Sequence, residues 1–182
     1  MEISEFTDLD RYVREYGRLG DALGVADAEP APGELEFLRF VTMPGRFDFG
    51  MLPTPDIFFA AAVTSILQPR LAIEIGTACG SSAAIIGKMI ALRQAQVGHV
   101  TSEPLVHTID RKAEYVLDRA KPGGFAIETM TPELRDRVIV HAPQDSAFCR
   151  ALVLDGELSF AFIDGNHRHP WPLADVLQLQ QG

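Results

Sequence analysis

The chain has few cysteines and no long apolar segment. Its 182 residues contain only Cys79 and Cys149, which are too few and too far apart for a disulfide framework or a zinc knuckle. No apolar segment approaches the roughly 20 residues of a membrane-spanning helix. Residues 1–18 are charged throughout and lack the apolar centre of a signal peptide. We therefore predict reduced, buried thiols, a cytoplasmic location and no membrane partner.

Positive charge is also scarce. The sequence has 16 Lys and Arg against 25 Asp and Glu, which gives a net charge of -9. Binding to nucleic acid requires concentrated Lys and Arg, so the composition argues against a nucleic-acid partner and against an anionic membrane surface. Apolar residues make up 47% of the chain, which suffices for a globular core. The length fits a single domain.

The N-terminal part of the sequence predicts helices separated by loops. Apolar residues recur at helical spacing in several segments, and clusters of Gly and Pro interrupt them. The predicted elements are helices over 6–23, 34–41 and 56–67, a linker over 26–33 and an irregular loop over 43–55.

From residue 70 onward, short apolar runs alternate with helical patterns. The predicted strands cover 71–75, 106–109, 137–141 and 158–163, and the helices that follow them cover 81–96, 112–120, 146–154 and 171–180. This alternation is typical of a parallel sheet with helices on both faces. The predicted fold class is α/β, a doubly wound, Rossmann-like, mostly parallel sheet. Residues 1–51 would form an N-terminal helical extension, and 52–182 the sheet domain.

The alternation stops after four strands. An open doubly wound sheet usually has more, so we expect that the C-terminal strands are missing and the sequence is truncated. The alternative is that the last strand is an exposed edge that pairs with another chain, as in a homo-oligomer.

A glycine turn follows the first predicted strand. In open α/β sheets, ligands bind beyond the carboxyl ends of the strands. Gly76 and Gly80 permit a tight turn and close approach of a ligand. The following helix N-terminus, with the Ser82 hydroxyl, suits a carboxylate. The spacing Gly-x-x-x-Gly differs from the dinucleotide fingerprint, so a pyrophosphate is disfavoured. A plain strand-to-helix turn is the alternative interpretation.

Acidic residues end the second and fourth predicted strands. Asp110 can accept hydrogen bonds from ribose hydroxyls, or it can act as a helix N-cap. Asp164 precedes His167 by three residues, and such a pair can hold a divalent metal or activate a hydroxyl. A histidine titrates near neutral pH and suits proton abstraction. A solvated loop is the alternative for His167 and His169.

Together, residues 72–82, 107–110 and 160–167 resemble three motifs of the class I S-adenosylmethionine-dependent methyltransferases. The similarity is greatest to the catechol O-methyltransferase-like and macrocin O-methyltransferase-like groups, which methylate small-molecule hydroxyls. The resemblance implies S-adenosyl-L-methionine (SAM) as the cofactor and a small-molecule substrate. Its methionine part would lie on the backbone of 76–78 with Ser82, its ribose on Asp110, and its adenine near 143–145. The expected cofactor-binding residues are Glu74, Gly76, Thr77, Ala78, Gly80, Ser82, Asp110, Arg111, Gln144, Asp145 and Asp164.

The resemblance also implies a catalytic pair. Asp164 would be the first ligand of an Mg²⁺-like ion, and His167 the general base that takes the proton of the substrate hydroxyl. Metal-dependent members supply a further acidic pair after a fifth strand, and the sequence ends at Gly182, before that point. Trp171 would either cap the site or anchor a helix.

Two further hypotheses remain open, and the sequence does not identify the methyl acceptor. A nicotinamide-dependent oxidoreductase on a Rossmann sheet is disfavoured by the glycine spacing. A non-catalytic cofactor-binding or assembly module would fit an exposed edge strand.

Overall fold

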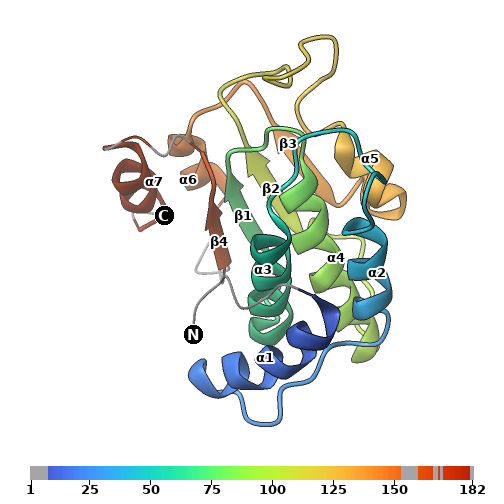
Figure 1. Ribbon diagram of the computed structural model, residues 1–182. Helices are drawn as coiled ribbons and strands as arrows, with labels where there is room; N and C mark the ends of the chain where they lie inside the picture. The colour runs from blue at the N-terminus through green and yellow to red at the C-terminus, as the bar shows by residue number, and fades with distance from the viewer. Residues whose placement is uncertain (1–7, 153–159, 166–167, 169, 181–182) are drawn as a thin grey trace. The chain divides into compact units, whose positions relative to one another are not determined.

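The computed structural model describes residues 8–152, 160–165, 168 and 170–180 (Figure 1). The chain divides into two compact units. The helical unit comprises residues 1–68 and 88–101, and the sheet unit comprises residues 69–87 and 102–182. Helix α4 (Ser81–Gln96) therefore contributes its first part to the sheet unit and the remainder to the helical unit. The boundary predicted between residues 51 and 52 stays a prediction.

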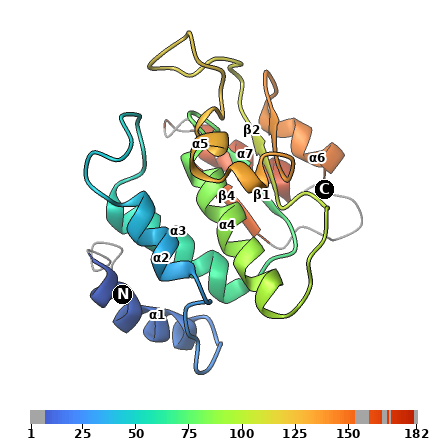
Figure 2. The same cartoon turned by 90° about the vertical axis from the view of Figure 1, so that its right-hand side faces the viewer.

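The helical unit contains the three helices predicted before residue 70, and all three are confirmed. They are α1 (Leu9–Ala22), α2 (Glu34–Val41) and α3 (Thr54–Leu67). The side chain of Asp8 caps α1 by accepting a hydrogen bond from the Arg11 amide (2.8 Å), which satisfies one of the free amides of the first turn. Helix α1 packs against both α2 and α3 (Figure 2).

A buried hydrogen-bond network joins the helices of this unit. The carboxylate of Glu34 is fully buried and accepts hydrogen bonds from the Tyr12 hydroxyl, the Ala31 amide (2.8 Å) and the Ser65 hydroxyl (2.6 Å). Ser65 in turn accepts a hydrogen bond from Nε of Arg93 (2.8 Å). Burial, followed by the charge of Glu34, raises the pKa of Tyr12 well above its ordinary value, so the phenol keeps its proton and remains a donor.

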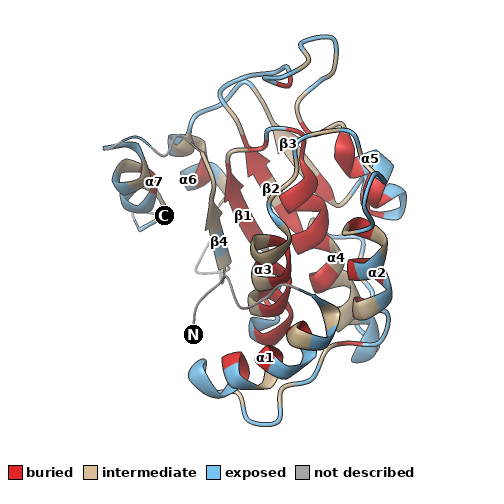
Figure 3. Cartoon of the chain, viewed as in Figure 1, coloured by how far each residue is buried: buried red, intermediate tan, exposed pale blue. Residues whose placement is uncertain are grey.

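The sheet unit contains four parallel strands in the order β3-β2-β1-β4. They are β1 (Ala72–Ile75), β2 (Val106–Ile109), β3 (Val138–His141) and β4 (Phe160–Ile163). This confirms the predicted Rossmann-like α/β fold. Strand β1 is buried along its whole length, whereas the edge strand β4 is partly exposed (Figure 3). Strands β2 and β3 lie on one side of β1, and β4 lies on the other side. The strand order therefore reverses between β1 and β4, which makes this position a topological switch point.

Both faces of the sheet are covered. On one face Ile73, Ile75 and Ile109 pack with Cys149 in a buried apolar cluster. On the other face α4 approaches closely through Gly87, where a Cβ atom would lie 2.9 Å from a Val138 methyl group. The short elements of this unit are α5 (Ala126–Met130), a 3-10 turn η2 (Pro132–Leu134), a 3-10 turn η3 (Ser146–Phe148), α6 (Cys149–Leu152) and α7 (Trp171–Leu179). Helices on both faces explain why the strands are mostly apolar.

The helix predicted over 112–120 was wrong. This segment is an irregular loop with one isolated bridge between Glu114 and Pro122. The carboxylates of Asp110 and Asp118 accept hydrogen bonds from the amides two residues later, on Lys112 (2.9 Å) and Ala120 (3.1 Å). Such local bonds compete with the helical ladder. The short helix α5, which follows this loop, was not predicted.

The helix predicted over 146–154 consists of η3 and α6, and residues 153–159 lie outside the described part of the chain. The helix predicted over 171–180 is confirmed as α7. Among the described residues, no helix combines the length and apolar character needed to cross a membrane.

Candidate functional site

A cavity of 920 Å³ lies beyond the carboxyl ends of the strands in the sheet unit. Ligand pockets commonly have volumes of about 300–1,000 Å³. Residues after all four strands line it, together with one face of α7. The lining residues that were predicted from the sequence are Gly76, Ala78, Asp110, Arg111, Gln144, Asp145 and Asp164. The strand-end rule therefore placed the cavity correctly.

The turn after β1 requires glycine because neighbouring backbone lies very close. Gly76 has φ +105°, and a Cβ atom there would lie 2.6 Å from the carbonyl carbon of Asp164 and 2.7 Å from the amide nitrogen of Gly165. Gly80 has φ +89°, and its Cβ would lie 2.8 Å from Cα of Gly124. The tight turn expected from these glycines is confirmed. The glycines also let the backbone after β1 approach the backbone at residues 164–165 and 124 closely, whereas the predicted approach of a ligand stays a prediction.

Asp110 is held in place by two backbone amides. Its Oδ2 accepts a hydrogen bond from the Ala78 amide (3.1 Å), and its Oδ1 accepts one from the Lys112 amide (2.9 Å). Ala78 adopts φ +45° in this turn. No helix follows Asp110, so the N-cap interpretation was wrong. Because each carboxylate oxygen has a second lone pair, Asp110 can still accept hydrogen bonds from a ligand in the cavity.

Four of the predicted cofactor-binding residues do not line the cavity. Glu74, Thr77 and Ser82 are buried, and Gly80 lies against Gly124. The hydroxyls of Thr77 and Thr108 share a hydrogen bond (2.7 Å), and Thr108 also donates to Oε2 of Glu74. These side chains support the turn from behind, and their predicted contacts with a cofactor stay predictions.

Burial gives Glu74 an unusual titration. Desolvation raises the pKa of this carboxyl to about 7, the hydroxyls of Ser82 and Thr108 oppose the shift, and the charges of Asp164 and Asp110 add to it. Near neutral pH the group therefore exchanges between a neutral and a charged form, directly behind the cavity wall.

Comparison with known protein families supplies an identity for this unit. A model of the methyltransferase domain family matches residues 73–181, which include all but the first residue of the four strands and all residues that line the cavity. The chain belongs to this family. A crystal structure of an O-methyltransferase from Bacillus cereus in complex with SAH is also similar. It shares 18% identity, the match covers 98% of this chain and 70% of that one, and the TM-score is 0.48. A search of curated proteins gave no match.

The predicted catalytic pair is only partly visible in this methyltransferase domain. Asp164 lines the cavity. His167 and His169 lie outside the described residues. Within the described part of the chain, no three His, Cys, Asp or Glu side chains form a group that could hold a metal ion. The roles of Asp164 as a metal ligand and of His167 as a base therefore stay predictions.

One face of α7 forms a wall of the cavity that was not predicted. Trp171, Ala174, Asp175 and Gln178 line it, at the spacing of residues on a single helix face. The guanidinium carbon of Arg111, another lining residue, lies 5.9 Å from the centre of the Trp171 ring. Of the two interpretations of Trp171, a cap on the site or a helix anchor, this position favours the cap. The sequence pattern defines this face of α7 but does not reveal what it packs against.

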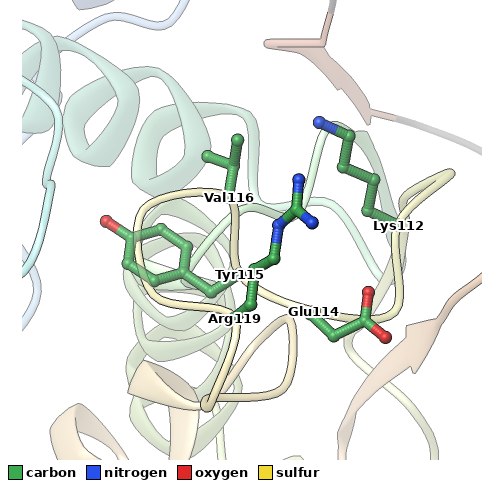
Figure 4. A pocket seen from close by; sticks show the side chains of 5 residues that line it. All are labelled: Lys112, Glu114, Tyr115, Val116 and Arg119. Atoms are coloured by element: carbon green, nitrogen blue, oxygen red, sulfur yellow. The ribbon is translucent and has the colours of Figure 1, made fainter.

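A smaller cavity of 390 Å³ lies within the loop that follows β2 (Figure 4). Its lining residues are Lys112, Glu114, Tyr115, Val116 and Arg119. Lys112, Glu114 and Val116 also line the larger cavity. The loop that replaces the predicted helix therefore forms part of the site.

Proposed function

We propose that the chain is a SAM-dependent methyltransferase that acts on the hydroxyl group of a small molecule. The observation that carries this proposal is Asp110, which two backbone amides hold on the wall of a 920 Å³ cavity in a methyltransferase domain. A carboxylate at the end of the second strand is suited to the two hydroxyls of a ribose. The structurally similar Bacillus cereus O-methyltransferase is in complex with SAH.

In this proposal the cofactor spans the strand ends. Asp110 accepts hydrogen bonds from the ribose, and Gln144 and Asp145 flank the adenine. The side chain of Asp145 already accepts a hydrogen bond from the Ala147 amide (3.0 Å), which fixes its orientation. The methionine carboxylate lies near the turn at Gly76 and the N-terminus of α4, where free amides and the helix dipole favour an anion.

The reaction transfers the methyl group from the sulfonium of SAM to the acceptor oxygen. The new C–O bond forms as the S–CH₃ bond breaks, the acceptor loses its hydroxyl proton to a base, and the sulfur leaves as the neutral thioether SAH. The contribution of the protein is to hold the oxygen in line with the S–CH₃ bond. We assign to His167 the role of the base that takes the hydroxyl proton. We assign to Asp164 the role of orienting the acceptor.

Assistance by Mg²⁺ remains an expectation from the resemblance. Asp164 is its one proposed ligand among the described residues, which do not provide a complete site, so no step above depends on a metal.

Calorimetric titration with SAM and with SAH tests the cofactor. We expect both to bind, and NADH titrated under the same conditions not to bind. A folded protein that binds neither SAM nor SAH would contradict the proposal.

Transfer of a labelled methyl group from SAM to a panel of catechols, phenols and sugar hydroxyls tests the acceptor class. Parallel reactions with Mg²⁺ and with EDTA test the metal separately. Transfer only to nitrogen or sulfur acceptors would contradict the hydroxyl assignment while leaving the cofactor assignment intact.

A further inference from the structure

Helix α7 presents two hydrogen-bond acceptors to the large cavity. Asp175 and Gln178 both line it, and residues three apart lie on the same side of a helix. Helix α7 contacts β4, η3 and α6, which belong to the same unit (Figure 1). The helix that carries these two side chains is therefore packed beside β4 within the sheet unit.

Asp175 is buried at the switch point of the sheet. Only 7% of the residue is exposed. A Cβ atom on Gly165 would lie 3.9 Å from Oδ2 of Asp175 and 3.5 Å from the carbonyl oxygen of Ile75. The carboxylate is thus close to the ends of both β1 and β4, in the crevice where ligands bind in open α/β sheets.

The interactions of the described residues leave this carboxylate without a hydrogen-bond donor or a cation. Asp175 forms none of their hydrogen bonds or salt bridges. Only 7% of the residue is exposed and it lines the cavity, so its partner must come from the solvent or from a ligand in that cavity. Holding a charge largely out of water without a partner is costly. Burial, and to a smaller extent the charge of Asp175, raises the pKa of the neighbouring Cys149 thiol, so this thiol supplies no charge near the carboxylate.

Gln178 repeats the same pattern one turn later. Its Oε1 atom is buried and has no hydrogen-bond partner among the described residues. Buried polar atoms are nearly always paired in folded proteins. Two unpaired acceptors on one helix face call for a ligand group that carries a positive charge and donates hydrogen bonds.

We propose that Asp175 and Gln178 bind the positively charged methionine part of SAM. This inference rests on the function proposed above and assigns a cofactor contact to α7. The methionine part carries two cationic groups, the ammonium and the sulfonium. Acidic side chains outnumber basic ones on the cavity wall, so its field favours a cation.

The Asp175→Asn variant tests the inference because it removes the charge and keeps the size. Affinities for SAM, SAH and methylthioadenosine are measured by calorimetry. Methylthioadenosine lacks both the amino acid group and the sulfonium charge. We expect SAM to bind about tenfold more weakly to the variant, the typical effect of losing a hydrogen bond to a charged group. Binding of methylthioadenosine should be unchanged.

The three ligands also separate the two cationic groups. Equal weakening of SAM and SAH identifies the ammonium as the group bound, and weakening of SAM alone identifies the sulfonium. Unchanged SAM binding, or equal weakening of all three ligands, would overturn the inference. If the wild-type protein binds no SAM, the proposed function fails instead.

Two further variants control for folding and net charge. Asp136→Asn makes the same change of charge on a side chain that is 88% exposed, and we expect it to leave SAM binding unchanged. Gln178→Met removes the second acceptor at similar volume, and SAM binding should weaken by about threefold, the lower range for a neutral hydrogen bond. Without ligand, Asp175→Asn should unfold at the same or a higher temperature than the wild type, because an unpaired buried charge has been removed.

Discussion

The amide of Ala78 donates a hydrogen bond of 3.1 Å to the carboxylate of Asp110, 32 residues later in the chain. This bond joins the turn after β1 to the end of β2. The left-handed backbone of Ala78, with φ +45°, turns its amide toward Asp110. The glycine turn and the acidic strand end, which the sequence presents as two separate signals, are therefore parts of one structure.

Replacing Asp110 should weaken cofactor binding. In Asp110→Asn only one oxygen remains to accept a hydrogen bond. The NH₂ group that replaces the other oxygen then faces the amide of either Ala78 or Lys112, which loses its acceptor. We expect the Kd for SAM to rise by at least about tenfold. The matched control is Asp118→Asn in the same loop, because Asp118 makes a similar bond to the Ala120 amide and does not line the cavity. Equal affinities of the two variants for SAM would contradict the role of Asp110.

Replacing Gly76 should destabilise the sheet unit. Gly76→Ala places a Cβ within 3 Å of the Asp164 and Gly165 backbone at φ +105°. Gly98→Ala is the control, since Gly98 has φ +70° with no atom within 4 Å. A left-handed conformation costs an L-residue about 1–2 kcal/mol, so the free energy of unfolding of Gly98→Ala should fall by about that amount. The free energy of unfolding of Gly76→Ala, measured by urea denaturation, should fall by clearly more. Equal decreases in the two variants would show that the close backbone contact at Gly76 is unimportant.

The buried network of the helical unit gives a prediction about stability. In Glu34→Gln a single carbonyl oxygen replaces two carboxylate oxygens that accept from Tyr12, Ala31 and Ser65. At least one buried donor loses its partner, and the free energy of unfolding should fall by about 1–3 kcal/mol. Glu36→Gln, an exposed position on the same helix, should change it by less than about 0.5 kcal/mol. If both variants are equally stable, the network contributes nothing measurable.

Some of these features could be predicted from the sequence because they depend on local patterns. The short run Val106–Ile109 begins and ends with a β-branched apolar residue and is followed by an acid, and β2 has those bounds. The rule that ligands bind at strand ends then places Asp110 and Asp164 at one cavity. Both residues directly follow a strand, so the strand pattern is enough to place them at the cavity wall, and their predicted roles stay predictions.

Other features depend on packing between distant segments. Glu34 resembles any acidic residue in the first turn of a helix, and only the fold brings Tyr12 and Ser65 to it. Asp175 resembles a solvent-facing helical residue until α7 is placed beside β4. The loop after Asp110 was predicted as a helix because its apolar residues recur locally, while hydrogen bonds from the carboxylates of Asp110 and Asp118 favour turns.

The raised pKa of Glu74 predicts a dependence of stability on pH. Below pH 4.5 the carboxyl is protonated in both folded and unfolded chains, so its burial carries no ionisation cost. Between pH 4.5 and about 7 the unfolded chain loses the proton while the folded chain retains it, so stability falls as the pH rises. Above pH 7 the cost is constant.

The Glu74→Gln variant isolates this contribution, because all other titrating groups remain. The free energy of unfolding of the wild type, relative to the variant, should fall by up to about 3 kcal/mol across that range, since each pKa unit is worth about 1.4 kcal/mol. Urea denaturation of both proteins at pH 5, 6, 7 and 8 measures it. A difference that does not change with pH would show that Glu74 titrates normally.

Trp171 should report cofactor binding directly by fluorescence. It is the only tryptophan in the chain, it lines the cavity, and it is 46% exposed. A bound cofactor would displace water from the ring, so we expect a blue shift of the emission and weaker quenching by acrylamide as SAM is added. The concentration dependence should give the same Kd as calorimetry. The Trp171→Phe variant should lose the signal and still bind SAM. Emission that stays constant at saturating SAM would place Trp171 away from the bound cofactor.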